Sequence, residues 1–318
     1  MVLAVLLTLS QFAAAQSATA AQPEQAEFPQ PVYVTMRASG TVETFPDRSV
    51  WKGGRNMLYD AVTPDGKRLL VTSPSEGSVH VFDTGSGRQL AVVPVGQAPK
   101  GVKVTPDGRF AWVSNQGSAN ISVIDLGSLE VVDTIGVEAE PHNARFTADG
   151  KRAYVTLQGG AGIGVIDTAQ RKMIRVIPVP GITGPHNLDL SPDEKTAWVR
   201  DFVHNVAVVD LESGKVRKVI EVGAGHGGID VSPDGRYVVT GAIADQVVSV
   251  IDPKTLEVRN VEVGNGPHGV RASADGHWIY VTLTRDNRVA VIDADTMKVV
   301  KKIAVGQFPF WVAVPGNP

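Results

Sequence analysis

A four-residue turn block recurs along the chain at a nearly constant interval, and this repetition constrains the fold more than any other feature. The block reads TPDG, TADG, SPDE, SPDG or SADG, and its aspartates are Asp65, Asp107, Asp149, Asp193, Asp234 and Asp275. The intervals between them are 42, 42, 44, 41 and 41 residues. A period of about 40–45 residues with strand-like content is typical of a four-stranded β-propeller blade.

Each interval holds the same four strand-like segments. In residues 100–137 they read KGVKVT, RFAWVSN, ISVID and VVDTIGV. β-Branched and aromatic residues favour strands, and Gly, Pro, Asp and Asn separate them. No stretch shows the period of an amphipathic helix.

The two ends of the chain supply the missing parts of one further blade. PFWVAV at 309–314 matches a first strand with nothing after it, whereas 32–36, 41–45 and 48–51 match the second, third and fourth strands. The sequence therefore predicts an all-β fold, a seven-bladed β-propeller of four-stranded antiparallel blades over residues 31–318. Pairing the C-terminal strand with the N-terminal strands would close the ring and remove its open sheet edges.

The N-terminal residues have the character of an export signal. An apolar run at 2–9 is followed by small residues that fit a cleavage site, although no Lys or Arg precedes it. We expect residues 1–15 to be a signal peptide, with cleavage as late as residue 21, and residues 16–30 to be a disordered lead-in. The run is shorter than the roughly 20 apolar residues of a membrane span. A periplasmic or secreted monomer is predicted.

Composition excludes several classes of function. The chain has no cysteine, which excludes disulfides, thiolate metal ligands and c-type haem attachment. Its net charge of −3, with no long basic run, gives no electrostatic support for nucleic-acid binding. The G-x-S-x-G, P-loop and HExxH motifs are missing.

Several strand segments resemble a known family. VYVTM at 32–36, AYVTL at 153–157 and IYVTL at 279–283 occur together with segments ending in V-I-D at 122–125, 164–167, 249–252 and 290–293. They resemble the YVTN repeat of the bacterial YncE-like seven-bladed propellers over about residues 31–314. The resemblance implies the fold, while the family's functions include surface, periplasmic and cofactor-linked roles. It also implies a distant similarity to haem d1-type propeller domains, which makes a haem-like macrocycle conceivable.

Most of the repeated aspartates have a structural explanation. Those of the turn block combine local hydrogen bonding with a flexible Gly. A second set ends the third strand of each blade before another turn. This second set is Asp83, Asp125, Asp167, Asp210, Asp252 and Asp293.

Four of the seven histidines precede the first strand of consecutive blades. His142, His186 and His268 lie seven residues before their turn aspartates, and His226 lies eight before. In a propeller these positions surround one mouth of the central channel. Converging neutral imidazoles would suit Zn²⁺ or Cu²⁺, hold an anion when protonated, or ligate a haem-like cofactor. Alternatively, the histidines were copied when the repeat was duplicated, and each one only caps the backbone of its own loop.

Charged residues stand four positions before five of the six turn aspartates, and alanine takes this place in the first full repeat and in the last strand. This ring consists of Ala61, Lys103, Arg145, Asp189, Asp230, Arg271 and Ala313. It predicts either ion pairs along a solvated channel, Arg145 with Asp189 and Asp230 with Arg271, or carboxylates of Asp189 and Asp230 that orient the histidines. The candidate cofactor-binding cations are Lys100, Arg145, Arg200 and Arg271.

Three functions fit these observations. The first is a propeller that binds a transition metal, a metal-bearing cofactor or a small ligand at the histidine-lined mouth. The second is a metal-assisted lyase or hydrolase, similar to streptogramin lyase or lactonase propellers, at the same face. The third is an interaction scaffold whose top face binds a protein partner and whose histidines have no direct role.

Overall fold

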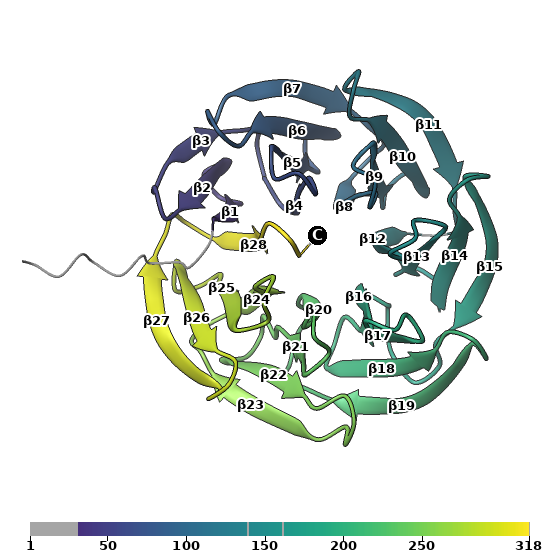
Figure 1. The fold of residues 1–318 in the computed structure, drawn as a ribbon, viewed down its shortest axis with the longest axis vertical. Helices are drawn as coiled ribbons and strands as arrows, with labels where there is room; N and C mark the ends of the chain where they lie inside the picture. The colour runs from purple at the N-terminus through teal and green to yellow at the C-terminus, as the bar shows by residue number, and fades with distance from the viewer. Residues whose placement is uncertain (1–30, 139, 161, 318) are drawn as a thin grey trace, which may run out of the picture.

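Seven four-stranded antiparallel sheets stand around a central channel (Figure 1). The computed structural model describes residues 31–138, 140–160 and 162–317, and the regular elements of this part of the chain are 28 β-strands. The predicted signal peptide and lead-in lie outside these residues. No helix of the described residues has the length and apolar character to cross a membrane.

The first blades are built from the N-terminal half of the chain. Their strands are β1 (Val32–Met36), β2 (Thr41–Phe45) and β3 (Val50–Lys52), then β4 (Asp60–Val62), β5 (Arg68–Ser73), β6 (Ser78–Asp83) and β7 (Gln89–Pro94), then β8 (Pro99–Val104), β9 (Phe110–Asn115), β10 (Asn120–Asp125) and β11 (Glu130–Gly136), then β12 (Pro141–Phe146), β13 (Arg152–Leu157), β14 (Gly162–Asp167) and β15 (Lys172–Pro178).

The remaining blades follow in chain order around the ring. Their strands are β16 (Asn187–Leu190), β17 (Thr196–Arg200), β18 (Asn205–Asp210) and β19 (Lys215–Glu221), then β20 (Ile229–Val231), β21 (Val238–Thr240), β22 (Val247–Ile251) and β23 (Val258–Glu262), then β24 (Pro267–Ala272), β25 (Trp278–Leu283), β26 (Arg288–Asp293) and β27 (Lys298–Ala304), and last β28 (Pro309–Ala313).

The recurring turn block joins the innermost strand of a blade to the next strand. In the first full repeat, the Asp65 carboxylate accepts hydrogen bonds from the Thr63 hydroxyl at 2.6 Å and the Lys67 amide at 3.0 Å. Gly66 takes the left-handed conformation, with φ +71°, that glycine adopts without steric cost. The other turn aspartates make the same pair of bonds, which confirms their structural role.

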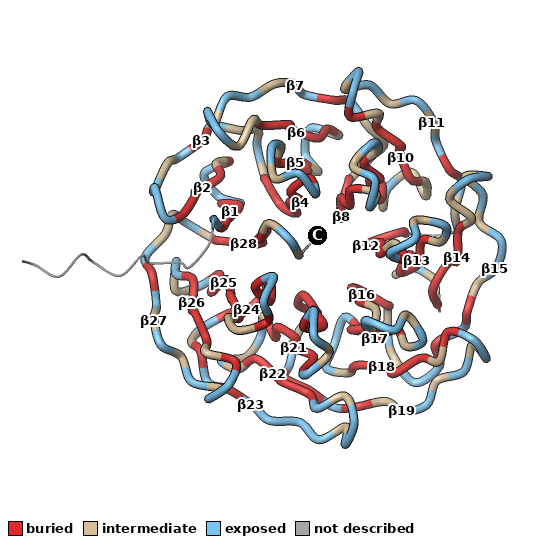
Figure 2. Tube along the Cα trace, in the orientation of Figure 1, coloured by how far each residue is buried: buried red, intermediate tan, exposed pale blue. Residues whose placement is uncertain are grey.

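The core lies between adjacent blades. One cluster joins Val32, Val34 and Val312 of the closing blade to Tyr280 and Val289 of the preceding blade. Figure 2 shows that the inner and middle strands are mostly buried, whereas the outermost strands β7, β11, β15, β19, β23 and β27 are largely exposed. Each blade therefore needs both neighbours to cover its two apolar faces.

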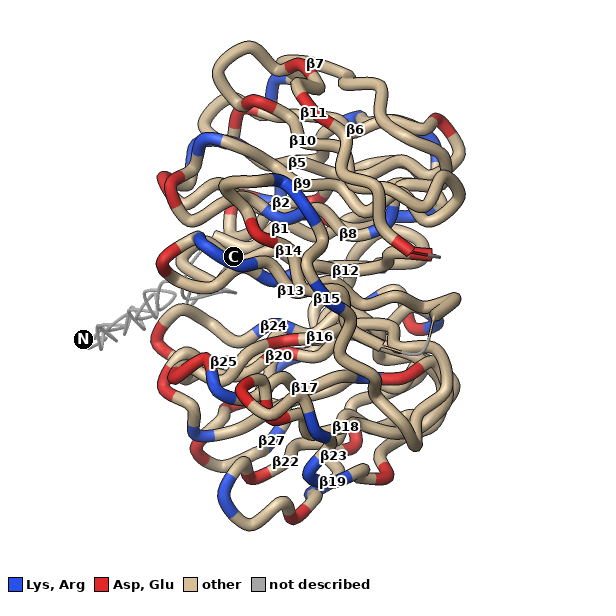
Figure 3. The backbone as a smooth tube through the Cα atoms, turned by 90° about the vertical axis from the view of Figure 1, so that its right-hand side faces the viewer, with Lys and Arg blue, Asp and Glu red and all other residues tan. Residues whose placement is uncertain are grey.

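The C-terminal strand completes the N-terminal blade, as predicted. β28 pairs antiparallel with β1, with Val34 opposite Val312, and the two strands lie side by side in Figure 1. The Trp311 amide donates to the Thr35 hydroxyl at 3.0 Å, and the Gly306 amide donates to the Glu43 carboxylate at 2.7 Å. Seen from one side, backbone positions of acidic and basic residues are interspersed along the blades (Figure 3).

A β-bulge at the start of the inner strand recurs in four blades. In β12, Pro141 pairs with Leu157 and Ala144 with Val155, so two residues, His142 and Asn143, face one on the partner strand. β8, β24 and β28 show the same shift of register. Residues three apart on a regular strand point to opposite faces, and the extra residue reverses this relation. The bulge thus allows a residue at the start of the strand and the residue three later to face the same channel.

The closure makes a direct prediction for the chain, which contains no natural cysteine. Val34→Cys combined with Val312→Cys should form a disulfide on oxidation, because the two residues are cross-strand partners. The disulfide should raise the melting temperature, with a gain in unfolding free energy of up to about 5 kcal/mol for so long a loop. Gel mobility without reductant and thermal unfolding measure both effects.

The control places the second cysteine one position further along. Val34→Cys with Ala313→Cys should not cross-link, because adjacent strand residues point to opposite faces of the sheet. Equal cross-linking in both variants would show that the register of the closure is different.

Candidate metal centre

The four predicted histidines form one arc at a mouth of the channel. Ring centroids lie 3.9 Å apart for His142 and His186, 4.8 Å for His186 and His226, and 5.2 Å for His226 and His268. His226, whose different spacing left its direction open, belongs to the arc. Because the four histidines come from consecutive blades, their imidazole rings form a row in which each ring packs against the next.

Three of these imidazoles approach the geometry of a metal site. One nitrogen from each of His186, His226 and His268 lies within 4.8 Å of the other two. His142 stays outside this triad, and its Nε2 forms a hydrogen bond of 3.2 Å with the Tyr59 hydroxyl. The Tyr59 ring also packs edge-on against the His142 ring at 5.3 Å.

A backbone carbonyl fixes the tautomer of His268. Its Nδ1 lies 3.0 Å from the carbonyl oxygen of Phe310, and because a carbonyl can only accept, the Nδ1–H donates. The proton on Nδ1 leaves the Nε2 lone pair free, and Nε2 has no hydrogen-bond partner among the described residues. This is the arrangement by which a second contact orients a metal-binding histidine.

Burial keeps the imidazoles uncharged. Desolvation, with smaller contributions from nearby cations, lowers the pKa of His226 to about 4 and that of His268 to about 3. The pKa values of His142 and His186 are also lowered well below the ordinary value by burial, assisted by Lys100 for His142 and by the neighbouring histidines for His186. Neutral imidazole is the form that binds a metal.

His186 is the least satisfied side chain of the arc. It is 3% exposed, and neither of its ring nitrogens has a hydrogen-bond partner among the described residues. An unpaired buried polar group costs about 1–3 kcal/mol. Because buried polar groups in folded proteins nearly always have a partner, the unpaired nitrogens of His186 point to a bound ligand. We therefore take His186 as the centre of the candidate site.

A cavity of about 270 Å³ opens beside the histidines. Its polar lining includes Arg37, Lys100, Gln116 and Gln158. Phe202 stacks on His226, with ring centroids 4.5 Å apart and planes 6° from parallel. The site therefore combines uncharged nitrogen ligands with two nearby cations and two amides.

The sequence matches the YncE-like β-propeller family over residues 62–193 and 199–315. The chain belongs to this family. No curated protein matches it at a significant level.

Solved structures share the fold of this YncE-like propeller. A chain of Kuenenia stuttgartiensis hydrazine synthase is 24% identical, with a TM-score of 0.76 over 82% of this chain and 90% of that one. A protein of unknown function from Desulfotomaculum acetoxidans is 15% identical, with a TM-score of 0.75 over 91% and 100%. Dihydro-haem d1 dehydrogenase NirN, in complex with DHE, is 18% identical, with a TM-score of 0.67 over 90% and 76%. At these identities the similarities show the fold alone.

Of the four predicted cofactor-binding cations, only Lys100 lines the histidine cavity. Arg200 is fully buried, and its terminal nitrogens donate to Asp201 at 3.0 Å and to backbone carbonyls of Asn205, Gly223 and Gly225. These contacts tie two loops of the same mouth together. A role of Arg200 in cofactor binding stays a prediction for this YncE-like propeller.

The charged ring lies deeper along the channel, away from the histidines. Arg145 Nε is 2.8 Å from Asp189, and Arg145 and Arg271 both donate to Asp230. The remaining acceptor contacts of Asp189 and Asp230 are with backbone amides of Leu190, Val231 and Ala272 and with the Asn317 side chain. Within the described residues, no hydrogen bond or ion pair joins either carboxylate to a histidine. These contacts are the ion pairs along the channel that the sequence offered as one alternative. They include no contact by which Asp189 or Asp230 would orient a histidine.

Sequence reasoning missed three residues of the site. Tyr59 follows Leu58, the residue that occupies the histidine position in the first full repeat. Phe202 belongs to a polar loop, and Arg37 follows the second strand of the closing blade. Only Phe202 carried a signal, as an aromatic residue in the otherwise mostly polar segment RDFVHN.

The lowered histidine pKa values predict the pH dependence of stability. Above about pH 6.5 both the folded and the unfolded chain hold neutral histidines. Between pH 6.5 and about 4 the unfolded chain binds more protons, so the metal-free protein should lose stability as the pH falls through this window. Urea unfolding with a chelator present, from pH 7.5 to 4.5, measures the effect.

The comparison variant is His226→Gln with His268→Gln. It should lose less stability than the wild type over the same pH range, since two groups with lowered pKa values are gone. An identical pH dependence in the two proteins would contradict the assignment of neutral, buried histidines.

Proposed function

We propose that this propeller binds a divalent transition-metal ion, Cu²⁺ or Zn²⁺, through His186, His226 and His268. The observation that carries the proposal is the convergence of three imidazole nitrogens within 4.8 Å at a site where burial keeps the rings neutral. Three histidines with one open position are a common ligand set for zinc, and imidazole also suits copper.

The arrangement fits a metal with only small side-chain adjustments. Zn–N bonds are roughly 2.0–2.1 Å, so nitrogens of a tetrahedral site lie roughly 3.4 Å apart. The nitrogens now lie within 4.8 Å of one another, and small rotations of the three imidazole rings would bring them to the separation of a tetrahedral site. The bond of His268 to the Phe310 carbonyl already orients its Nε2 for binding. His142, whose ring centroid lies 3.9 Å from that of His186, would supply a fourth nitrogen to a tetragonal copper site if its hydrogen bond with Tyr59 opened.

The open position would face the cavity and its cations. Arg37 and Lys100 favour a small anionic ligand there, and burial together with Arg37 lowers the pKa of Lys100. A metal with an open position also suits the alternative of a metal-assisted lyase or hydrolase, with a bound water or carbonyl activated by the ion. Measured turnover of the ligand would distinguish a lyase or hydrolase from a protein that only binds the ligand.

A haem-like macrocycle is supported less well. The cavity of about 270 Å³ is smaller than the roughly 300–1,000 Å³ of organic cofactor sites, and Arg145 and Arg271 lie in the deeper ring. The interaction-scaffold alternative draws on Phe202 and Val203, which are 44% and 40% exposed beside the same mouth. The interaction scaffold would become the leading alternative if the histidines bound no ion.

Calorimetric titration of untagged, chelator-treated protein tests the proposal. The wild type should bind Cu²⁺ or Zn²⁺ near 1:1, still bind at pH 5.5, and lose binding near pH 4, where His226 becomes protonated. His186→Ala should weaken binding by about 100-fold or more, since loss even of an orienting partner costs about 10–100-fold.

His80→Ala is the matched control. His80 is also buried, but Glu76 and Gln89 occupy its nitrogens at 2.9 and 3.0 Å, in β6 and away from the mouth. Its loss should leave the affinity unchanged. Equal affinity of wild type, His186→Ala and His80→Ala would refute the site.

We also propose that the protein acts outside the cytoplasm, on the strength of its N-terminal apolar run and small residues. The mature chain should begin near Gln16 or as late as Gln22. N-terminal sequencing of the native protein from separated cell fractions measures this. A cytosolic protein that retains Met1 would contradict it.

A further inference from the structure

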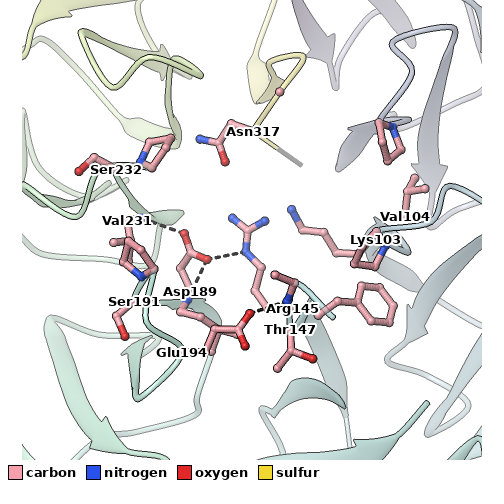
Figure 4. Close-up of a pocket in the computed structure, with 18 residues that line it drawn as sticks. Lys103, Val104, Arg145, Thr147, Asp189, Ser191, Glu194, Val231, Ser232 and Asn317 are labelled. Carbon is pink, nitrogen blue, oxygen red and sulfur yellow. Dashed lines mark hydrogen bonds and ion pairs between the residues drawn. The ribbon is translucent and has the colours of Figure 1, made fainter. Parts of the chain in front are cut away.

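A second cavity, of about 480 Å³, lies at the opposite mouth of the channel. Its lining comes from the turn blocks that follow the inner strands, whereas the histidine cavity is lined by residues that precede them. Figure 4 shows the charged side chains of Lys103, Arg145 and Asp189 reaching into this cavity. No function proposed above uses it.

Lys103 is the unsatisfied residue of this cavity. It is 5% exposed, and its Nζ has no hydrogen-bond partner among the described residues. Burial, together with the charges of Arg145 and Arg271, lowers the pKa of Lys103 well below its ordinary value. Without an anion beside it, the buried amine therefore favours its neutral form, whereas a bound anion would favour the ammonium form.

The neighbouring carboxylates are committed elsewhere. Asp189 pairs with Arg145, and Asp230 receives hydrogen bonds from Arg145 and Arg271, so two carboxylates already match two guanidinium groups. Asp60 is 2% exposed, and neither of its oxygens has a hydrogen-bond partner from another described residue. Burial raises the pKa of Asp60 well above its ordinary range, so its carboxyl favours the neutral form. The Lys103 amine therefore has no direct carboxylate partner among the described residues, although the more distant charges of Asp189 and Asp230 favour its protonated form.

Much of the remaining lining is apolar. Its other polar residues are Thr147, Ser191, Ser232, Asn317 and Glu194, whose carboxylate accepts a hydrogen bond from the Ala148 amide. The prolines of four turn blocks form its wall, together with Val104, Phe146, Leu190 and Val231. These prolines are Pro64, Pro106, Pro192 and Pro233. A site with one unpaired buried amine, which a bound anion would hold as ammonium, and a largely apolar wall matches a ligand with one negative charge and an apolar body.

We propose that this second cavity binds a small organic monocarboxylate, with its carboxylate on Lys103 and its apolar body against the turn prolines. Arg145 stands beside Lys103 as the second cation facing the carboxylate. A phosphate or sulfate dianion fits less well, because one uncompensated cation does not balance two charges and the apolar wall would have no contact with it. The proposal does not depend on the metal site.

Benzoate is the test probe, measured by calorimetry and thermal shift. The wild type should bind it with a Kd of about 1 mM or lower. Acetate should bind about 10-fold more weakly or worse, since it buries far less apolar surface. Benzamide, which has the same shape without the charge, should give no thermal shift, and inorganic phosphate should not displace benzoate.

Two variants separate a ligand site from a purely structural ion network. Lys103→Met should melt at the same temperature as the wild type or higher without ligand, because an unpaired buried cation is removed. The variant should lose at least about 10-fold in benzoate affinity, a loss of about 1.4 kcal/mol. Asp60→Asn should leave binding unchanged, since the Asp60 carboxyl already favours its neutral form and has no hydrogen bond to Lys103. Both variants should bind metal like the wild type.

Four results would overturn the proposal. The first is that the wild type binds no benzoate at a concentration of about 10 mM, ten times the expected Kd. The second and third are equal benzoate binding by wild type and Lys103→Met, and equal binding of benzamide and benzoate. The fourth is a melting temperature of Lys103→Met well below that of the wild type. The last would show that Lys103 stabilises the fold as part of its ion network.

Discussion

The pairing of β28 with β1 is the interaction on which the rest of the structure depends. It fixes the ring, and the ring directs every inner strand at one axis. Both candidate sites contain residues of the closing segment. The Phe310 carbonyl of β28 orients His268, and the Asn317 side chain donates to Asp230 at 2.8 Å. A chain that failed to close would lose the geometry of both mouths together with the packing of its edge blades.

The bulged inner strands divide the channel into two layers. The histidine of β12 or β24 lies at the start of the strand, and the arginine three residues later lies near its end. Three residues of a strand span about 10 Å, so one strand serves both mouths. The upper layer holds neutral nitrogens, and the lower layer holds charges that pair with one another except at Lys103. A metal and a carboxylate would therefore occupy separate ends of the channel without competing.

The sequence predicted what local chemistry and repetition determine. The turn block sets the blade period, the ends of the chain reveal the closure, and the position seven residues before the turn aspartate locates His142, His186 and His268. Contacts between blades were not predictable in this way. The sequence placed Asp189 in the right ring and offered its ion pair with Arg145, but it could not decide between that pair and a contact with a histidine.

Asp60 illustrates a signal that was present but not used. The equivalent position of the next two blades holds Val102 and Ala144, and in the blade of β24 it holds Val270. A carboxyl group among positions that are otherwise apolar marks a change in chemistry that a search for charged repeats does not detect. The burial that makes Asp60 and Lys103 unusual arises only when the ring is complete.

The most direct measurement of the central claim is anomalous X-ray diffraction from crystals grown with Zn²⁺. The account predicts one strong anomalous peak at the channel mouth, roughly 2.0–2.1 Å from a nitrogen of each of His186, His226 and His268. The result that would contradict it is a saturated crystal with no peak at this mouth, whose three histidines are bonded to protein groups or water alone.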